Sequence, residues 1–390
     1  MKNKIISTWR FSWLMAVVLL GAACSANKTA ATKTAGNQLP AKGEILKTLR
    51  LTNDYFMAAW PDPGKSITTN KTRPSNLWTR AVYYEGLMAL YQVDKQQRYI
   101  DYAVDWGQKH NWGLRNGRNT RDADDQCAGQ TYIDLYGMDP KPERIADIKH
   151  SIDNMVNSPK ADDWFWIDAL QMAMPVFAKL GVLYKDDRYF EKMYELYNFS
   201  KTKHGGNGLF NPADGLWWRD KDFVPPYKEP NGEDCYWSRG NGWVVAALVR
   251  VMDIMPKEAP HYDEYRQMYL TMMKALVPIQ RPDGYWNVSL HDPTHYGGKE
   301  VTGTALFIYG MAYGLNKGLL DEKTYKPIIA KAWNAMATEA VHPNGFLGYV
   351  QGTGKEPKDG QPVSYTSKPD FEDYGLGCFL LAGTEIMKLK

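Results

Sequence analysis

The chain has 390 residues and a formal net charge of +3, from 47 basic and 44 acidic side chains. These charges are spread along the chain without a basic block or stripe, which excludes the electrostatic footprint of a nucleic-acid-binding protein. After Cys24, the remaining three cysteines have no Cys-x-x-Cys spacing, so the sequence indicates neither a disulfide framework nor a zinc site.

The N-terminal segment has the pattern of a bacterial export signal. Basic residues precede an apolar run that is too short to act as a membrane-spanning helix. The small residues before Cys24 resemble a lipobox and predict a signal peptide over residues 1–23 with lipidation of Cys24; ordinary cleavage nearby is the alternative. Residues 24–43 have little to bury and predict a flexible tether. We therefore expect an exported lipoprotein, periplasmic or outer-membrane anchored, held to a membrane by its lipid.

From residue 44 onward, apolar segments with small residues alternate with charged amphipathic segments at helical spacing. The apolar segments cover residues 81–91, 126–136, 168–180, 242–255, 303–315 and 373–387. The amphipathic segments cover residues 97–110, 142–155, 188–203, 262–280 and 322–340, and a helix within residues 42–60 supplies a sixth. This repeat of form predicts an all-α fold, an (α/α)6 barrel of six helical hairpins, as one domain over residues 44–390.

Several polar residues stand at the starts of the apolar helices, namely Asp124, Asp125, Asp168, Arg239 and Glu300. If the inner helices run in one direction, their N-termini gather at one mouth of the barrel, and these side chains face a single pocket. The alternative is that each carboxylate only caps its helix and pairs with the helix dipole. Asp125 is the residue that capping explains best.

Asp168 follows two tryptophans and a phenylalanine in residues 162–169, Asp-Asp-Trp-Phe-Trp-Ile-Asp-Ala. Apolar neighbours desolvate a carboxyl group and raise its pKa, so Asp168 is predicted to keep the proton that a general acid needs. Asp124 is expected to remain charged and to orient water or its protonated partner. Two such carboxyl groups are the usual equipment for cleaving a glycosidic bond. A helix cap within a hydrophobic wall is the alternative for Asp168.

The stretch over residues 236–243, Tyr-Trp-Ser-Arg-Gly-Asn-Gly-Trp, combines aromatic rings with one cation. The indoles of Trp237 and Trp243 suit stacking on the apolar face of a sugar, and the planar Arg239 guanidinium suits a carboxylate. A sugar acid is therefore the predicted ligand. The alternative is a buried Trp cluster tied down by a structural salt bridge, because aromatic residues are usually core residues.

Several motifs together resemble glycoside hydrolase family 105, the unsaturated rhamnogalacturonyl hydrolases, which are close relatives of the unsaturated glucuronyl hydrolases of family 88. The similarity spans roughly residues 44–390. The motifs are Trp78, Glu85-Gly86, residues 123–132 (Ala-Asp-Asp-Gln-Cys-Ala-Gly-Gln-Thr-Tyr), 166–168 (Trp-Ile-Asp), 237–243 (Trp-Ser-Arg-Gly-Asn-Gly-Trp), 300–305 (Glu-Val-Thr-Gly-Thr-Ala) and 373–377 (Asp-Tyr-Gly-Leu-Gly).

The resemblance implies a six-hairpin barrel that acts on pectin (rhamnogalacturonan) fragments left by polysaccharide lyases, which are functional rather than physical partners. Such fragments end in a 4,5-unsaturated uronic acid. The implied chemistry protonates C4 of the vinyl ether and adds water at C5, after which the hemiketal collapses and releases the other sugar. By position, Asp168 matches the proton donor and water activator and Asp124 the second active-site Asp. No metal or organic cofactor is implied.

For substrate binding, we expect Trp237, Trp243 and Trp78 to pack against sugar rings, with Glu300 also at the site. Arg239 is expected to hold the uronate carboxylate or an active-site Asp. Arg219 is also expected to bind the substrate. It stands where family members often carry a His, so the identity of the second sugar stays open. Two other functions remain open: a conventional inverting glycosidase on a saturated oligosaccharide, and a non-catalytic surface glycan-binding lipoprotein.

Overall fold

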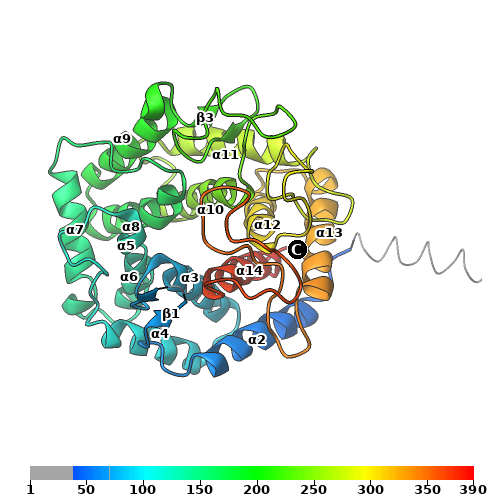
Figure 1. Ribbon diagram of the computed structural model, residues 1–390. Coiled ribbons are helices and arrows are strands. Elements are labelled where there is room, and N and C mark those ends of the chain that lie inside the picture. Colours follow the sequence, from blue (N-terminus) through cyan, green and yellow to red (C-terminus); the bar gives the residue numbers. More distant parts are fainter. Residues whose placement is uncertain (1–37, 70) are drawn as a thin grey trace, which may run out of the picture.

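The computed structural model of the protein describes residues 38–69 and 71–390 (Figure 1). The predicted signal peptide, the lipidation residue Cys24 and most of the predicted tether lie outside these residues. The first helix, α2 (Lys42–Ala59), includes the last two residues assigned to the tether.

Six helices form an inner ring, as the sequence predicts. They are α3 (Trp78–Val93), α6 (Ala128–Met138), α8 (Asp168–Tyr184), α10 (Ser238–Ile254), α12 (Val301–Asn316) and α14 (Asp373–Ile386). Each packs against the next, and α14 packs against α3, which closes the ring (Figure 1). Nearly every position of α8, α10, α12 and α14 is buried, because these helices are covered on all sides.

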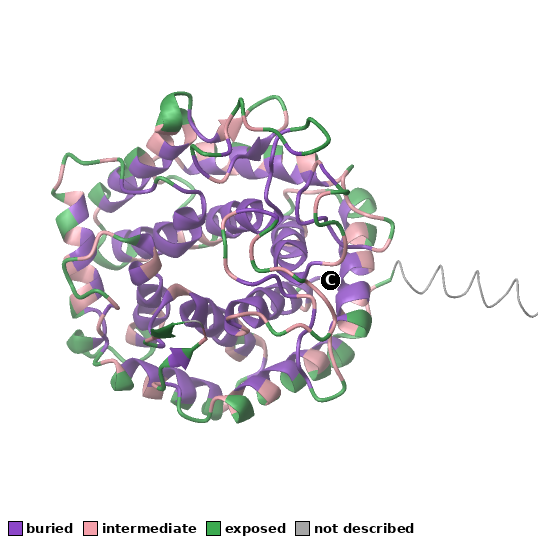
Figure 2. Ribbon diagram, in the orientation of Figure 1, coloured by how far each residue is buried: buried purple, intermediate pink, exposed green. Residues whose placement is uncertain are grey.

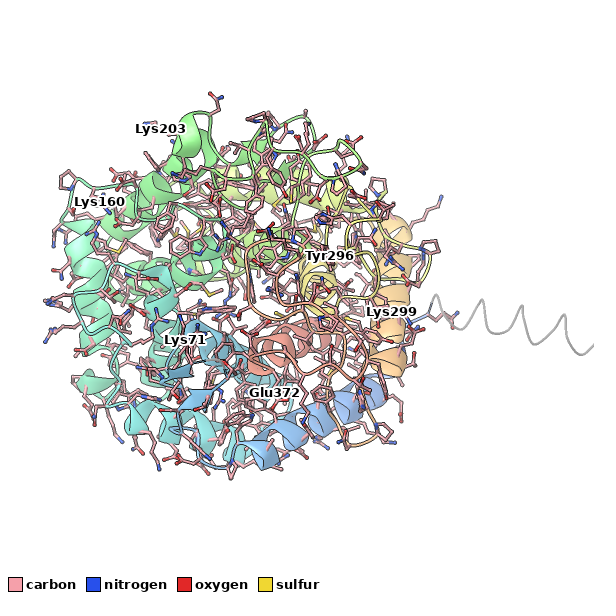
Figure 3. The ribbon with its side chains drawn as sticks, viewed as in Figure 1. Lys71, Lys160, Lys203, Tyr296, Lys299 and Glu372 are labelled. Carbon is pink, nitrogen blue, oxygen red and sulfur yellow. The ribbon has the colours of Figure 1, made fainter. Side chains whose placement is uncertain are left out.

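Six further helices surround this ring. They are α2, α4 (Gln97–Lys109), α7 (Ala146–Val156), α9 (Arg188–Thr202), α11 (Tyr262–Leu276) and α13 (Glu322–Glu339). Each buries one face against the inner ring and exposes the other (Figure 2). Side chains fill the space between the two rings (Figure 3). The predicted all-α barrel of six helical hairpins is therefore confirmed.

Short elements interrupt the loops between these helices. They are the one-turn helix α5 (Ala123–Gln126), the 3-10 helices η1 (Pro142–Arg144) and η2 (His204–Gly206), and two antiparallel strand pairs, β1 (Ile67–Thr68) with β2 (Thr72–Arg73) and β3 (Phe210–Asn211) with β4 (Leu216–Trp217). The segment predicted as one helix over 142–155 is η1 followed by α7. Within residues 38–69 and 71–390, no helix has the length and apolarity needed to cross a membrane.

The inner helices run in one direction. Trp78 and Asp168, the first residues of α3 and α8, line a pocket at one mouth of the barrel, whereas residues near the C-terminal ends of the inner helices line a cavity at the other mouth. The long connection from α13 to α14 passes over the first mouth (Figure 1). A shared direction was the condition under which polar residues at helix starts were expected to face one pocket, and it explains why Asp124 and Asp168 line the same pocket.

Ring closure depends on two glycines that let α3 and α14 come into backbone contact. A Cβ atom added at Gly377 would lie 2.3 Å from the carbonyl oxygen of Val82, and one at Gly86 would lie 2.7 Å from that of Gly377. Beside this contact, the buried Arg80 guanidinium donates to Asp373 at 3.0 Å. The first and last inner helices are thus joined by backbone packing and one buried ion pair.

We predict that Gly377→Ala lowers the free energy of unfolding by about 1–3 kcal/mol or more, because its methyl group meets backbone atoms that cannot rotate away. Urea unfolding measures the change. Gly137→Ala is the matched control: Gly137 also lies in an inner helix, and nothing approaches its added Cβ within 4 Å. The control is expected to stay within about 1 kcal/mol of wild type. Equal effects of the two substitutions would contradict the proposed closure contact.

Candidate active site

A pocket of about 250 Å³ opens at the mouth where the inner helices begin. Four residues predicted from the sequence line it, namely Trp78, Asp124, Asp168 and Arg219. They are joined there by Arg73, Leu77, Arg115, Trp166, Met172, Thr353 and Gly354. The volume lies near the lower end of small-molecule sites, which hold roughly 300–1,000 Å³, so the pocket suits a single sugar ring.

Asp168 is held in place by the segment before α8. The Ile167 amide donates to the carbonyl oxygen of Arg219 at 3.0 Å, and Trp166 forms an antiparallel bridge with Asp220. This pairing brings the Arg219 guanidinium beside the Asp168 carboxylate: its Nε donates to Asp168 Oδ2 at 3.2 Å and its Nη1 to Asp220 Oδ2 at 2.7 Å. Asp168 is the first residue of α8, whose N-cap is Ile167.

Asp124 lies in α5, whose cap is a different aspartate from the one expected. The Asp122 side chain accepts from the Asp124 amide at 2.9 Å and caps the helix. Asp125 is fully buried and accepts from Arg115 Nε at 2.7 Å, as well as from the side chains of Asn116 and Thr120. The capping interpretation of Asp125 is therefore wrong: it anchors the loop that presents Arg115 to the pocket.

The two carboxyl groups of the pocket both resist ionisation. Burial raises the pKa of Asp168, as predicted, although the positive charges of Arg219 and Arg239 oppose the shift. Burial also raises the pKa of Asp124 to about 7, with help from the negative charges of Asp122 and Asp168. The sequence suggested that Asp124 remains charged, but with a pKa of about 7 it is partly protonated at neutral pH. Because the two carboxylates repel each other, ionisation of one raises the pKa of the other, and the apparent pKa values belong to the pair.

Arg239 and Trp237 do not line this pocket, which corrects the sequence-based assignment. The Arg239 guanidinium is 1% exposed and donates to the carbonyl oxygens of Gln351 at 3.0 Å and Gly352 at 2.8 Å. Trp237 is equally buried, and its indole N–H donates to Gln351 Oε1 at 3.0 Å. Both side chains are covered by the α13–α14 connection and support it, so neither holds an active-site Asp or presents a free face to a sugar.

Trp243 and Glu300 also lie outside the pocket. Trp243 is fully buried and packs edge-on against Trp78, with ring centroids 6.1 Å apart. The Glu300 carboxylate caps α12 by accepting from the amides of Thr302 and Gly303, each at 2.8 Å. For Glu300 the capping alternative is therefore confirmed, and for Trp243 the buried-core alternative. Trp78, which is partly exposed, is the predicted tryptophan that reaches the pocket.

Arg73, Arg115 and Thr353 are pocket residues that the sequence did not single out. Arg73 lies on β2, with its guanidinium 5.2 Å from the centre of the Phe371 ring. Among the residues that the structure describes, it forms no ion pair, whereas Arg115 is paired with Asp125 and Arg219 with two aspartates. Arg115 and Thr353 come from irregular loops and Arg73 from a two-residue strand, where no periodicity marks a functional position.

The family model described as Glycosyl Hydrolase Family 88 matches residues 49–390. This chain belongs to glycosyl hydrolase family 88. It is therefore a glycoside hydrolase, and the predicted enzyme class is confirmed. The predicted resemblance to family 105 is consistent with this, since a solved family 105 glycoside hydrolase from C. acetobutylicum has the same fold, at 21% identity over 87% of this chain and 99% of that chain, with a TM-score of 0.69. The family shown is nevertheless its relative, family 88.

Three further proteins are 30–32% identical to this chain. The "Unsaturated 3S-rhamnoglycuronyl hydrolase" of Formosa agariphila is 30% identical over 333 residues, which are 80% of this chain and 85% of the relative. A solved family 88 glycosyl hydrolase from Bacteroides vulgatus is 32% identical, with a TM-score of 0.81, over 89% of this chain and 99% of its own. A solved chain described as a polysaccharide lyase is 31% identical, with a TM-score of 0.81, over 89% of this chain and 98% of its own.

The site consists of carboxyl groups, guanidinium groups and aromatic rings. Within the described part of the chain, no group of three or more His, Cys, Asp or Glu side chains is placed to hold a metal ion. The three described cysteines, Cys127, Cys235 and Cys378, are free and buried.

We predict that the unfolding free energy of wild type falls relative to that of Asp124→Asn as the pH rises from about 4 to 8. The pKa of Asp124 is about 7 in the folded protein and 3.8 ordinarily. The folded state therefore binds this proton more tightly than the unfolded state does, and the stabilisation that results is lost as the pH rises from about 4 to 8. Asn keeps the shape and cannot ionise. Denaturant unfolding at several pH values measures the difference, and parallel profiles would contradict the raised pKa.

Proposed function

We propose that this family 88 hydrolase removes a terminal 4,5-unsaturated uronic acid from lyase-generated oligosaccharides, with rhamnogalacturonan fragments of pectin as the source. The observation that carries the proposal is the presence of two carboxyl groups of raised pKa, the buried Asp168 and the partly buried Asp124, in a pocket that also holds three arginines. The name of the Formosa agariphila relative, an unsaturated rhamnoglycuronyl hydrolase, supports the same substrate class.

In the proposed reaction, the Asp168 carboxyl group donates its proton to C4 of the C4=C5 double bond. The positive charge that develops at C5 is shared with the ring oxygen. Water adds at C5, and the proton that it loses passes to the Asp168 carboxylate, which restores the donor. The hemiketal then opens to a C5 ketone, which leaves a hemiacetal at C1 that releases the second sugar as an alcohol. After donation, the Asp168 carboxylate is stabilised by Arg219 at 3.2 Å.

The effect of Asp124 on this step depends on whether its carboxyl group is protonated. Because burial and neighbouring charge hold its pKa at about 7, a protonated Asp124 leaves a single negative charge in the pocket when Asp168 ionises. When ionised instead, Asp124 repels the Asp168 carboxylate and raises the pKa of that donor. In either state it faces the same pocket, where it can orient the attacking water by a hydrogen bond.

Arg73 is the residue that we propose for the uronate carboxylate, in place of Arg239. It lines the pocket and has no carboxylate partner among the described residues, so its planar fork is free for a bidentate contact. Arg115 and Arg219 are already engaged with aspartates. Trp78 and Trp166 line the same pocket and offer apolar faces to the sugar ring.

The absorbance of the conjugated C4=C5 double bond tests the proposed reaction directly. Wild type is expected to remove this absorbance from lyase-digested rhamnogalacturonan or from a related unsaturated disaccharide. Asp168→Asn is expected to be slower by about 10²–10⁴-fold, because it removes the proton donor. Asp187→Asn, an exposed aspartate at the start of the outer helix α9, is the matched control and should retain wild-type activity.

Three other outcomes would each contradict the proposal. A rise in absorbance would indicate elimination, the reaction type in the description of the 31% identical solved chain. Turnover of saturated oligosaccharides with no change in absorbance would indicate a conventional inverting glycosidase. Binding without turnover, unaffected by Asp168→Asn, would indicate a glycan-binding protein.

A second test addresses Arg73. We expect Arg73→Met to lower kcat/KM for the unsaturated substrate by about 10–100-fold, the effect of losing one or two charge-assisted hydrogen bonds. Arg73→Lys should recover part of this loss, because it restores the charge without the fork. Arg266→Met, on the exposed face of α11, is the control. An Arg73→Met enzyme with wild-type kcat/KM would exclude Arg73 as the carboxylate ligand.

We also propose that the enzyme works outside the cytoplasm as a lipoprotein anchored through Cys24. The support is the export signal and lipobox pattern of residues 1–24, which lie outside the described structure. The export and the anchor stay predictions.

A further inference from the structure

A cavity of about 300 Å³ lies at the other mouth of the barrel, where the inner helices end. Every inner helix contributes to its wall, and one lining residue from each is, in chain order, Met88, Asp134, Lys179, Arg250, Tyr309 and Leu381. Gln92 and Met138 also line the cavity and are exposed, so it is open to solvent.

This cavity is separate from the candidate active-site pocket. The two share no lining residue. Lys179 lies about three turns after Asp168 on α8, which is roughly 16 Å along the helix axis. A molecule bound among the C-terminal ends of the inner helices therefore does not touch the carboxyl groups at the first mouth.

The carboxylates of this wall already have partners within the protein. Three of them are each paired with a lysine, and the pairs are Asp134–Lys179, Asp253–Lys317 and Glu385–Lys388. The fourth, Glu85, uses both oxygens, which accept from Gln171 Nε2 at 2.6 Å and from the Cys127 thiol at 3.3 Å. These pairings disfavour a cation as the ligand of the cavity.

Arg250, in contrast, has donors that the protein does not use. Its side chain is 12% exposed, and its Nε donates to Gln130 Oε1 at 3.0 Å. The Glu85 carboxylate is 3.7 Å from this Nε, which is too long for a hydrogen bond. Among the residues that the structure describes, the two Nη atoms of Arg250 donate to no acceptor. A carboxylate offers two oxygens at the spacing of this guanidinium fork.

Glu85 compensates the charge of Arg250 only in part. Burial raises the pKa of Glu85, although the positive charge of Arg250 opposes the shift. Its two oxygens are also occupied by groups other than Arg250. The cavity therefore holds a guanidinium group that an anion from outside the protein can neutralise.

The remaining open groups of the wall suit a hydroxylated ligand. The hydroxyl groups of Tyr309 and Tyr313 form no hydrogen bond within residues 38–69 and 71–390. Gln92 accepts from Lys95 Nζ at 2.9 Å through its Oε1, and its Nε2 donates to nothing in the same part of the chain. Hydroxyl and amide groups beside aromatic rings match the alternating polar and apolar faces of a sugar.

We propose that this cavity is a second ligand site, which binds a single sugar acid with its carboxylate on Arg250 and its hydroxyl groups on Tyr309 and Tyr313. The volume suits one ring. The inference goes beyond the proposed function and does not depend on it, because its residues do not line the pocket of Asp168 and Asp124.

Isothermal titration calorimetry with two matched sugars tests this site. Galacturonate and galactose differ only in the carboxylate that replaces the hydroxymethyl group. We expect wild type to bind galacturonate at least about tenfold more tightly than galactose, and Arg250→Met to abolish this difference, because the variant loses the charge-assisted hydrogen bonds. Cyclohexanecarboxylate, which has the carboxylate without hydroxyl groups, should bind wild type more weakly than galacturonate does.

Ala89→Phe provides a test that does not depend on removing the largely buried Arg250. Ala89 is a partly exposed residue of α3 that lines the cavity, so a phenyl ring there fills the space that the sugar needs. This variant should lose galacturonate binding. Ala337→Phe, at a partly exposed position of the outer helix α13 that does not line the cavity, is the matched control and should bind galacturonate as wild type does.

Four results would overturn this inference. They are equal affinity of wild type for galacturonate and galactose, galacturonate binding that survives both Arg250→Met and Ala89→Phe, cyclohexanecarboxylate binding as tight as that of galacturonate, and loss of galacturonate binding in Arg73→Met. The last result would place the sugar in the candidate active-site pocket, which Arg73 lines. All four leave the absorbance test of the proposed function unaffected, so the two proposals can fail separately.

Discussion

The backbone contact between α3 and α14 is the constraint on which the site depends. These helices are the first and last of the inner ring, and they meet because Gly86 and Gly377 have no side chains to keep their backbones apart. The neighbouring Arg80–Asp373 ion pair joins the same two helices near their starts. Since Trp78 is the first residue of α3, the position of one pocket wall follows directly from this closure.

Beneath the pocket, a buried carboxyl group joins the helices that carry the two aspartates. Glu85 on α3 accepts from Gln171 Nε2 at 2.6 Å and from the Cys127 thiol at 3.3 Å. Gln171 lies one turn after Asp168 on α8, and Cys127 lies directly after α5, the helix of Asp124. Arg250 on α10 adds a cation 3.7 Å from the same carboxylate. A buried polar cluster of this kind restricts how far the segments that carry Asp124 and Asp168 can move relative to each other.

The Trp-Ser-Arg-Gly-Asn-Gly-Trp stretch has a structural role in the mouth of the barrel. Arg239 holds the carbonyl groups of the loop that brings Thr353 and Gly354 to the pocket, and the Asn241 side chain bonds the backbone N–H and carbonyl group of Trp217. These residues position backbone segments at the mouth of the barrel. The sequence suggested direct sugar contacts because a sequence motif does not show whether a tryptophan is buried or exposed.

The sequence by itself was enough to predict the (α/α)6 barrel and to place the carboxyl groups of Asp124 and Asp168 in one pocket. Helical periodicity with small residues predicts buried inner helices, and the shared direction of these helices places Asp124 and Asp168 at one mouth, where α5 and α8 begin. Tertiary structure decided which arginine is free. Arg239 and Arg73 are chemically identical, but long-range packing brings backbone carbonyl groups to Arg239 and leaves Arg73 on a hairpin without an ion partner among the described residues. A local pattern predicts a helix and its end, whereas the partner of a charged group depends on segments far away in the chain.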